Sequence, residues 1–270
     1  WGEILPQATL LLWAEQGLGD TLQFLRYLPM AAERVGQVVL RVPAGLSDLS
    51  CEMAGASPNV TVIAQDHELP SHDLHCPLMS LPLAFETMPQ TVPNLPYLRV
   101  PGERGEKWKE AFGPRGKPRI ALVWSGGQRR LNNPTRDMPL AALQHLVDAI
   151  DADWVSLQKE VSEADAALLA KLPQIHRLDR DLEDFADTAA ILAQTDLLIS
   201  VDTAVAHLAG AMGKPVWLAL RKASEWRWLG QAEDRPWYPS MRQFRQLEHG
   251  DWNAPIEAMK KQLVETLACQ

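Results

Sequence analysis

The stretch SVDTAVAHLAGAMGKPVW, Ser200–Trp217, decides the fold class. An apolar strand predicted over 196–201 runs into a helix predicted over 203–212, and the chain returns through Gly213 into a strand over 215–219. The small residues of this helix allow it to lie close to a sheet. The first turn of a helix has backbone N–H groups without intrahelical partners and a partial positive charge, which together form an anion site. The stretch therefore predicts a βαβ unit of a parallel sheet with a ligand site where strand meets helix.

Three polar residues distinguish this corner from an ordinary crossover. Asp202, Thr203 and His207 follow the strand, and the last two are four residues apart, so they share the helix face near its start. A plain βαβ crossover also contains alanine and glycine at these positions. Spacing alone leaves both interpretations open, and the polar residues favour a binding site.

A second corner of the same kind lies near the start of the chain. A strand predicted over 8–14 is followed by Gln16-Gly17-Leu18-Gly19-Asp20 and a helix over 20–34. The two glycines allow a tight turn and the close approach of a ligand, although the third glycine of a dinucleotide fingerprint is missing. Because ligands of open α/β sheets bind beyond the carboxyl ends of strands, Asp20 is placed to act as a general base. The alternative is that Asp20 only caps the helix.

A third candidate site is the loop 125–137, which follows a strand predicted over 119–124. Ser125 and Gly126 begin it, and its donors are Arg129, Arg130, Asn132, Asn133 and Arg136. Guanidinium groups present forked donors that suit phosphate oxygens, so the loop predicts a diphosphate site, with a solvated loop as the alternative. Lys159, beyond the next strand, is either a further cation for this site or a surface lysine.

Alternation of strands and helices occurs twice and predicts parallel sheets with helices on both faces. The first half has strands 8–14, 37–42 and 59–64 with helices 20–34 and 45–54. The second half has strands 119–124, 153–157, 174–178, 196–201 and 215–219 with helices 139–150, 162–171, 184–194, 203–212 and 254–267. A proline- and histidine-rich passage over 67–101 and a charged run over 102–109 separate the halves and predict a linker.

Composition limits the function classes. The chain has 270 residues, 46% of them hydrophobic, which suffices for one large or two modest domains. A net charge of −8 argues against a nucleic-acid or anionic-membrane surface. Three irregularly spaced cysteines fit a reducing compartment, so we expect a cytoplasmic protein. The sequence has no apolar run of ~18 residues and no basic leader, and we expect the chain to begin inside a longer protein or to follow processing.

The motifs together resemble two-domain B-type (GT-B) glycosyltransferases, and specifically the heptosyltransferase-like family 9, in the branch at the C-terminal end of bacterial tetratricopeptide-repeat proteins. The resemblance covers nearly the whole chain. Its motifs are Glu15–Thr21, Val123–Gly126, Ser156–Lys159, Asp184–Ala189, Ser200–Gly210, Trp226–Trp228, Trp237–Arg242 and Gly250–Trp252. The resemblance implies two Rossmann-like domains facing a cleft. It implies an acceptor-side domain over 1–101, a nucleotide-sugar-binding domain over 106–245, and a helix 254–267 that packs back on the first domain.

The resemblance implies transfer of a sugar from a nucleotide-diphosphate sugar to a hydroxyl of a saccharide or protein acceptor, without a cofactor or metal. Asp20 would be the catalytic base, and Gln16, Gly17 and Gly19 would form the acceptor-side loop. The donor would be bound by Ser125, Gly126, Arg136, Lys159, Asp202, Thr203, Ala204 and His207. At Ala204 the heptosyltransferases usually have glycine. The alternatives are an inactive nucleotide- or sugar-binding module of a larger repeat protein, and an unrelated two-domain α/β protein.

Two groups of residues have the composition of metal sites without their spacing. His67, His72, His75 and Cys76 fit no standard structural-zinc pattern. Metal-dependent sugar transferases use an Asp-x-Asp pair, and this string occurs at Asp151–Asp153 and Asp179–Asp181. The first lies at the start of a predicted strand, the wrong end for a site, and the second lies in a charged loop. The sequence therefore predicts no metal site.

Overall fold

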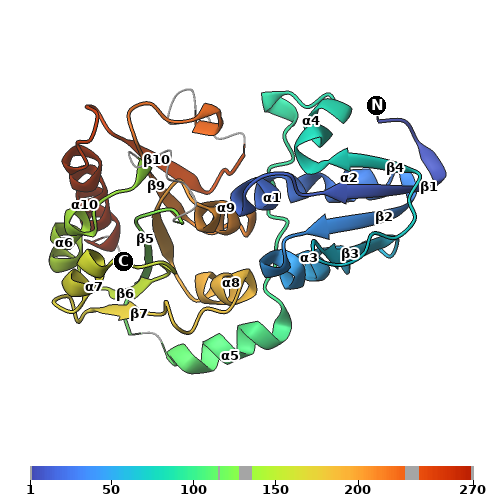
Figure 1. Cartoon of the computed structure of the whole chain (residues 1–270). Coiled ribbons are helices and arrows are strands. Elements are labelled where there is room, and N and C mark those ends of the chain that lie inside the picture. The colour runs from blue at the N-terminus through green and yellow to red at the C-terminus, as the bar shows by residue number, and fades with distance from the viewer. Residues whose placement is uncertain (1, 115, 128–135, 229–236, 269–270) are drawn as a thin grey trace.

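The computed structural model of the chain describes residues 2–114, 116–127, 136–228 and 237–268. Their strands form two separate sheets, both parallel throughout (Figure 1). The first has the order β3-β2-β1-β4 and consists of β1 (Leu5–Trp13), β2 (Val35–Val42), β3 (Val60–Ala64) and β4 (Leu74–Pro77). The second has the order β10-β9-β8-β5-β6-β7 and consists of β5 (Arg119–Val123), β6 (Asp153–Ser156), β7 (Ile175–Arg177), β8 (Leu197–Val201), β9 (Val216–Leu220) and β10 (Met241–Arg245). The predicted α/β class with parallel sheets is confirmed.

We call the residues around the first sheet the N-terminal half and those around the second the C-terminal half. The helices of the N-terminal half are α1 (Leu18–Phe24), α2 (Leu28–Ala32), α3 (Ser47–Ala54) and α4 (Leu81–Ala84). Those that follow are α5 (Gly102–Phe112), α6 (Leu140–Ala149), α7 (Glu163–Leu169), α8 (Phe185–Ala193), α9 (Ala204–Ala211) and α10 (Asn253–Ala268). The helix predicted over 20–34 is divided into α1 and α2 by a 3-10 turn, with Pro29 in the first turn of α2.

Strand order reverses once in each half, and such reversals mark where a ligand site is expected. In the C-terminal half the chain begins at β5, adds β6 and β7 on one side, and then adds β8, β9 and β10 on the other. The order therefore reverses between β5 and β8. In the N-terminal half it reverses between β1 and β4. Crevices beyond the carboxyl ends of strands at such reversals are where open α/β sheets bind ligands.

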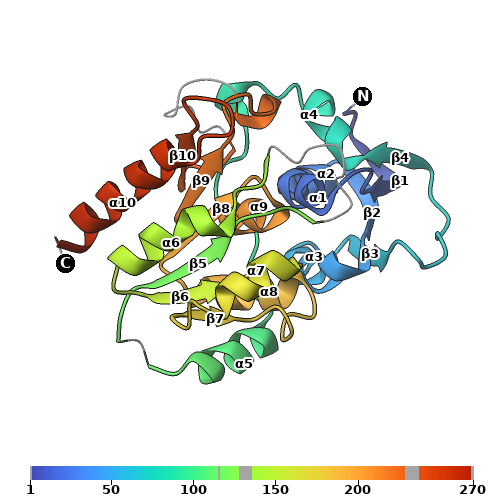
Figure 2. The ribbon, with the colours of Figure 1, turned by 60° about the vertical axis from the view of Figure 1, so that its left-hand side comes forward.

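The two halves are packed against each other through α1 and α9, which lie side by side in both views (Figures 1 and 2). One hydrophobic core runs across this contact. It includes Leu12 and Leu22 of the N-terminal half and Leu208 and Ala209 of the C-terminal half, all fully buried. A second core lies entirely in the C-terminal half beneath α6 and α10. The carboxyl-end corner of β1 is therefore held close to that of β8.

The predicted return of the C-terminal helix to the first domain is wrong. Helix α10 packs on α6 and β10, and Figure 1 shows it at the side of the C-terminal half away from the first sheet. Its apolar residues Ile256, Met259 and Leu263 belong to the core of the C-terminal half. An apolar stripe shows only that a helix needs an apolar surface, and the core of the second sheet supplies one here.

The elements missed in the sequence include β4, β10, α4 and α5. Strand β4 adds to β1 within the passage predicted as a loop, and its short run Leu-His-Cys-Pro has no alternating pattern. Helix α5 covers the charged run predicted as a linker. Its buried Trp108 packs near Phe112 four residues on, so the run is one face of an amphipathic helix.

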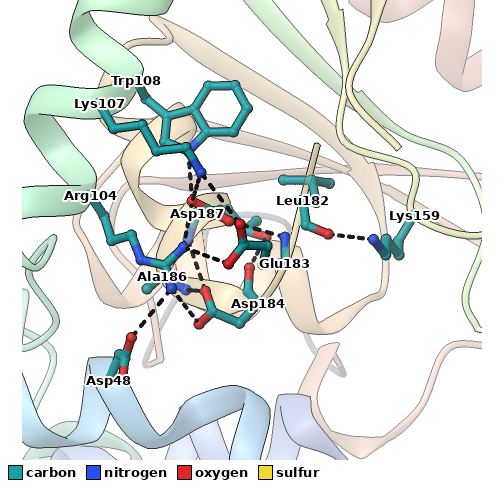
Figure 3. Close-up of polar contacts among 11 residues, drawn as sticks. Asp48, Arg104, Lys107, Trp108, Lys159, Leu182, Glu183, Asp184, Ala186 and Asp187 are labelled. Carbon is teal, nitrogen blue, oxygen red and sulfur yellow. Dashed lines mark hydrogen bonds and ion pairs between the residues drawn. The ribbon is translucent and has the colours of Figure 1, made fainter. Parts of the chain in front are cut away.

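Helix α5 is attached to α8 by a buried carboxylate (Figure 3). Asp187 of α8 is fully buried and accepts a hydrogen bond of 2.8 Å from Trp108 Nε1. It also lies 3.0 Å from Arg104 Nη1 and 3.4 Å from Lys107 Nζ. Burial alone would raise the pKa of Asp187, but the hydrogen bonds from Trp108 and from the Glu183 N–H and the two cations outweigh burial and lower it.

We expect Asp187→Asn to destabilise the fold at pH 7 by about 1–3 kcal/mol, because a charged hydrogen-bond acceptor is lost. Since the pKa of Asp187 is lowered on folding, its contribution is present above about pH 4 and is lost as the pH falls through the folded-state pKa. Urea unfolding at pH 7 and pH 3 measures this, and the difference from wild type should shrink at pH 3. Glu183→Gln is the control, because Glu183 pairs with the same Arg104 while its side chain is 69% exposed. A difference that persists at pH 3 would contradict this account.

Candidate functional site

The corner after β1 presents Asp20 to the C-terminal half. Asp20 lies in the first turn of α1, is 9% exposed, and accepts a hydrogen bond of 2.8 Å from the Gly17 N–H through Oδ2. Its other oxygen, Oδ1, forms an ion pair with Arg227 Nη2. Asp20 therefore closes the start of α1, as the capping alternative predicts. Its carboxylate also faces the C-terminal half, where the proposed base would have to lie. Gln16 is exposed beside it.

The corner after β8 is built by hydroxyl groups. Thr203 caps α9 by accepting from the Ala206 N–H, and its hydroxyl lies 3.0 Å from that of Ser200. His207 is buried, with Nδ1 3.0 Å from the Tyr238 hydroxyl and Nε2 3.7 Å from Asp202 Oδ1. The predicted grouping of Asp202, Thr203 and His207 at the tip of α9 is thus present in the structure.

Asp202 has an unusual charge state. Its side chain is buried, and burial raises the pKa of the carboxyl to about 7. A hydrogen bond with Glu225 and the charge of Glu225 also raise the pKa of Asp202. The charge of Arg136 and a hydrogen bond with the Trp228 side chain lower it. Near neutral pH the site therefore holds a carboxyl that can be protonated, and a protonated carboxyl does not repel a phosphate.

We expect Asp202 to contribute a fall in the free energy of unfolding as the pH rises from about 4 to 7. The pKa of Asp202 rises from its ordinary 3.8 to about 7 on folding, so its contribution is present below about pH 4 and is lost as the pH rises through 7. One such group changes stability by at most about 1.4 kcal/mol per pH unit. In urea unfolding between pH 4 and 8, the slope of the unfolding free energy against pH should be less negative for Asp202→Asn than for wild type. A slope identical to that of wild type would contradict the assignment.

The corner after β5 places a guanidinium against the backbone. Arg136 is 8% exposed, and its guanidinium lies so close to Gly126 that a Cβ there would overlap it. Gln158, buried beyond β6, accepts from the Ser125 N–H at 3.0 Å and donates to the Ser125 carbonyl at 3.1 Å, which fixes this loop. The charge of Arg136 lowers the pKa of Asp202, so the two side chains lie near each other. The corners after β5 and β8 are therefore neighbours, as the strand order requires.

Lys159 donates to the loop after β7. Its ammonium donates to the backbone carbonyls of Asp179 and Leu182, the second of which Figure 3 shows. This contact favours a role in holding the loop after β7 and does not bring Lys159 to the corner after β8. Arg129, Arg130, Asn132 and Asn133 lie outside the described residues.

The two halves meet where these corners lie. A Cβ on Gly19 would come within 2.9 Å of His207 Cδ2 and 3.4 Å of Ala204 Cα, so α1 and α9 can approach this closely only because residue 19 is glycine. Asp20, one residue on, contacts Arg227 of the C-terminal half. The structure thus brings the predicted base and the predicted donor corner to one junction.

Several residues of this junction were not singled out as site residues in the sequence. They are Gln23, Arg26, Glu225, Arg227 and Tyr238. Arg227 and Tyr238 lie in the tryptophan-rich segments that carry part of the resemblance, and this was a signal that could have marked them. Gln23 and Arg26 lie in an apolar helix, where a buried polar side chain is informative only once its partner is known.

Among the residues that the structure describes, no group of three or more His, Cys, Asp or Glu side chains is placed to hold a metal ion. His72 of the histidine-rich passage lies 3.0 Å from the Pro70 carbonyl. Two cavities, of about 250 and 630 Å³, lie away from the junction, one beside Leu10 and Phe85 and the other beside Trp217 and Leu263. No described helix is long and apolar enough to cross a membrane.

Residues 181–249 match the family model of glycosyltransferase family 9 (heptosyltransferase). The match includes Asp202, Thr203, His207 and Arg227, whereas the predicted donor residues Ser125, Gly126 and Arg136 lie before it. The predicted relationship to family 9 is confirmed at this level.

Relatives of known sequence or structure extend the likeness to nearly the whole chain. The chain is 28% identical over 283 residues to Protein FlbA of Caulobacter vibrioides, which covers 93% of this chain and 45% of FlbA, so it spans less than half of that relative. The E. coli ADP-heptose lps heptosyltransferase II matches with a TM-score of 0.62 and 14% identity over 97% of this chain and 98% of that chain. The iron-containing dodecameric glycosyltransferase TibC of enterotoxigenic E. coli matches with a TM-score of 0.63 and 11% identity over 98% and 78%. These two identities show the fold alone.

Proposed function

We propose that this chain transfers a sugar from a nucleotide-diphosphate sugar to an acceptor hydroxyl at the junction of its two halves. The observation that supports this most strongly is the meeting of three strand-end corners. Those after β5 and β8 flank the strand-order reversal of the second sheet, and the one after β1 brings a carboxylate to them. The family 9 segment and the heptosyltransferase fold support the same reaction class.

On the donor side, Arg136 and the first turn of α9 bind the diphosphate. Leaving-group charge builds on the nucleotide diphosphate during transfer, and guanidinium and helix N–H donors stabilise such charge when they are positioned in advance. Ser125 and Gly126 shape the backbone beside Arg136, and Thr203, Ala204 and His207 lie at the helix tip. We propose that the reaction needs no metal, and that residues 106–245 form the nucleotide-sugar-binding domain.

On the acceptor side, Asp20 deprotonates the acceptor hydroxyl while the anomeric carbon is held in line. Positioned proton transfer of this kind typically contributes ~10²–10⁴-fold to a rate. Gln16, Gly17 and Gly19 form the loop that the acceptor approaches, within an acceptor-side domain over 1–101. The acceptor is a saccharide or a protein.

One observation favours a second candidate, a nucleotide-binding module without transferase activity. Both carboxylate oxygens of Asp20 have partners, and Asp20, Asp202 and His207 are each less than a tenth exposed. A transferase would need the halves to separate, or the strand-end loops to move, before substrates reach these groups. A module that only binds nucleotide needs access to the C-terminal half alone.

We further propose that the chain is the C-terminal part of a longer bacterial protein with tetratricopeptide repeats before it, acting in the cytoplasm. The length of FlbA supports a longer protein, since this chain covers 45% of it.

Nucleotide binding followed by turnover tests the proposal. Thermal unfolding in the presence of UDP, GDP, ADP and CMP compounds identifies the nucleotide, because binding stabilises the folded state by RT ln(1 + [L]/Kd). We expect one nucleotide diphosphate to raise the unfolding temperature, and its sugar conjugate to be consumed when an acceptor is supplied. Stabilisation without turnover would favour the binding module, and stabilisation by none of these compounds would contradict both candidates.

A further inference from the structure

Arg227 makes polar contacts to both halves through all of its donor groups. It lies in the 3-10 turn η6 (Trp226–Trp228) and is 7% exposed. Its Nη2 pairs with Asp20 Oδ1, its Nε donates to Gln23 Oε1 at 2.5 Å, and its Nη1 donates to Glu225 Oε2 at 2.8 Å. The first two partners belong to α1, more than 200 residues away in sequence, and the third to its own half.

The geometry of the guanidinium fixes the direction of the Asp20 carboxylate. A guanidinium is planar and presents its donors in a rigid fork. The hydrogen bonds from Arg227 Nε to Gln23 and from Arg227 Nη1 to Glu225 therefore fix the position of Arg227 Nη2. The Gly17 N–H holds the other Asp20 oxygen. One oxygen of the carboxylate is thus bound by the backbone at the start of α1, and the other is bound by Arg227 of the C-terminal half.

We propose that Arg227 is the positioning residue for Asp20, an inference that rests on the proposed transfer reaction. Arg227 holds the carboxylate oriented at the junction until the acceptor hydroxyl arrives. When the acceptor proton moves to Asp20, the carboxylate loses its charge. Arg227 remains paired with Glu225, so no unpaired cation is left buried at that step.

A purely structural role predicts a different behaviour, and Arg26 provides the comparison. Arg26 is 3% exposed and also joins the halves, since it donates to the Trp237 carbonyl at 2.8 Å and to the Pro93 carbonyl at 3.0 Å. Its guanidinium lies over the rings of Tyr97, Trp237 and Tyr238. Its described hydrogen bonds reach carbonyl and hydroxyl oxygens and no carboxylate. Arg26→Lys therefore weakens the junction without touching Asp20.

The test compares Arg227→Lys with Arg26→Lys in a transfer assay with the donor identified by the nucleotide panel. Lysine keeps the charge but loses the fork. We expect Arg227→Lys to lower kcat by about 10- to 100-fold with the donor KM nearly unchanged, since misplacement of a catalytic group by ~1 Å has such effects. Arg26→Lys should retain kcat. In Arg227→Ala, added guanidinium ion should restore part of the rate.

A second measurement needs no activity. The unfolding temperatures of Asp20→Asn, Arg227→Lys and the double variant should be non-additive, with the double variant losing less than the sum of the two. Additive losses overturn the proposal. So does a kcat of Arg227→Lys equal to that of Arg26→Lys in an otherwise active protein, in which case the transfer reaction stands. If wild type transfers no sugar while the unfolding temperatures are non-additive, the proposed function falls and the role of Arg227 in catalysis falls with it.

Discussion

Gly126→Ala should weaken nucleotide-diphosphate binding by about 10- to 150-fold, the factor expected when a hydrogen bond to a charged group worth ~1.5–3 kcal/mol is lost. The new Cβ would overlap the Arg136 guanidinium, which must then leave its place beside the backbone. Isothermal titration with the nucleotide found in the panel measures the affinity. Arg136→Ala should produce a loss of the same size, because both changes act on the same cation.

Gly127→Ala is the matched control. The side chain nearest to a Cβ at this position is Glu160, whose Oε1 lies 3.6 Å away at ordinary contact distance, so Arg136 is left in place. We expect wild-type affinity for this variant. Equal losses in Gly126→Ala and Gly127→Ala would mean that the loop backbone, and not the guanidinium, binds the nucleotide.

Asp20→Asn should lower the rate of sugar transfer by about 10²–10⁴-fold while nucleotide affinity stays unchanged. Asparagine has the same shape and retains an oxygen that can accept from the Gly17 N–H, so the helix start is preserved. It loses the ability to take a proton, and the amide nitrogen that replaces Oδ1 cannot accept from Arg227 Nη2. Initial rates at saturating donor and acceptor measure the effect.

Glu15→Gln controls for the change of charge in the same turn, because Glu15 is exposed and precedes the glycines. It should transfer sugar at the wild-type rate. Normal turnover in Asp20→Asn would overturn the catalytic role of Asp20. Loss of nucleotide affinity in Asp20→Asn would instead mean that the ion pair with Arg227 supports the donor site.

The strand-to-helix corners were predictable because each combines two local signals. An apolar run ending in glycine or Asp-Thr before a helix fixes both the strand end and the side chains beyond it. The reversal of strand order then brings the corners after β5 and β8 together without further information. Asp202, Thr203 and His207 were found in this way. Arg136 was predicted only as a donor of the loop that Ser125 and Gly126 begin. That its guanidinium lies against Gly126, whose missing side chain leaves room for it, is shown by the structure alone.

What the sequence could not supply were contacts between distant segments. Asp20 and Arg227 are 207 positions apart in the sequence. The residues around either one give no sign that the other is its partner. In the sequence, Lys159 cannot be distinguished from a lysine that binds phosphate. Its hydrogen bonds to the carbonyls of Asp179 and Leu182 favour a role in stabilising the loop after β7. The destination of α10 and the helical state of α5 likewise depend on which apolar surface lies near, which a stripe of apolar residues does not specify.

The most direct test of the account is a crystal structure with the nucleotide diphosphate that stabilises the protein most. We predict that its phosphate oxygens lie within hydrogen-bond distance of the Arg136 guanidinium and of the backbone N–H groups at the start of α9, between the carboxyl ends of β5 and β8. Phosphates bound in either cavity away from the junction, or contacting neither Arg136 nor α9, would contradict it.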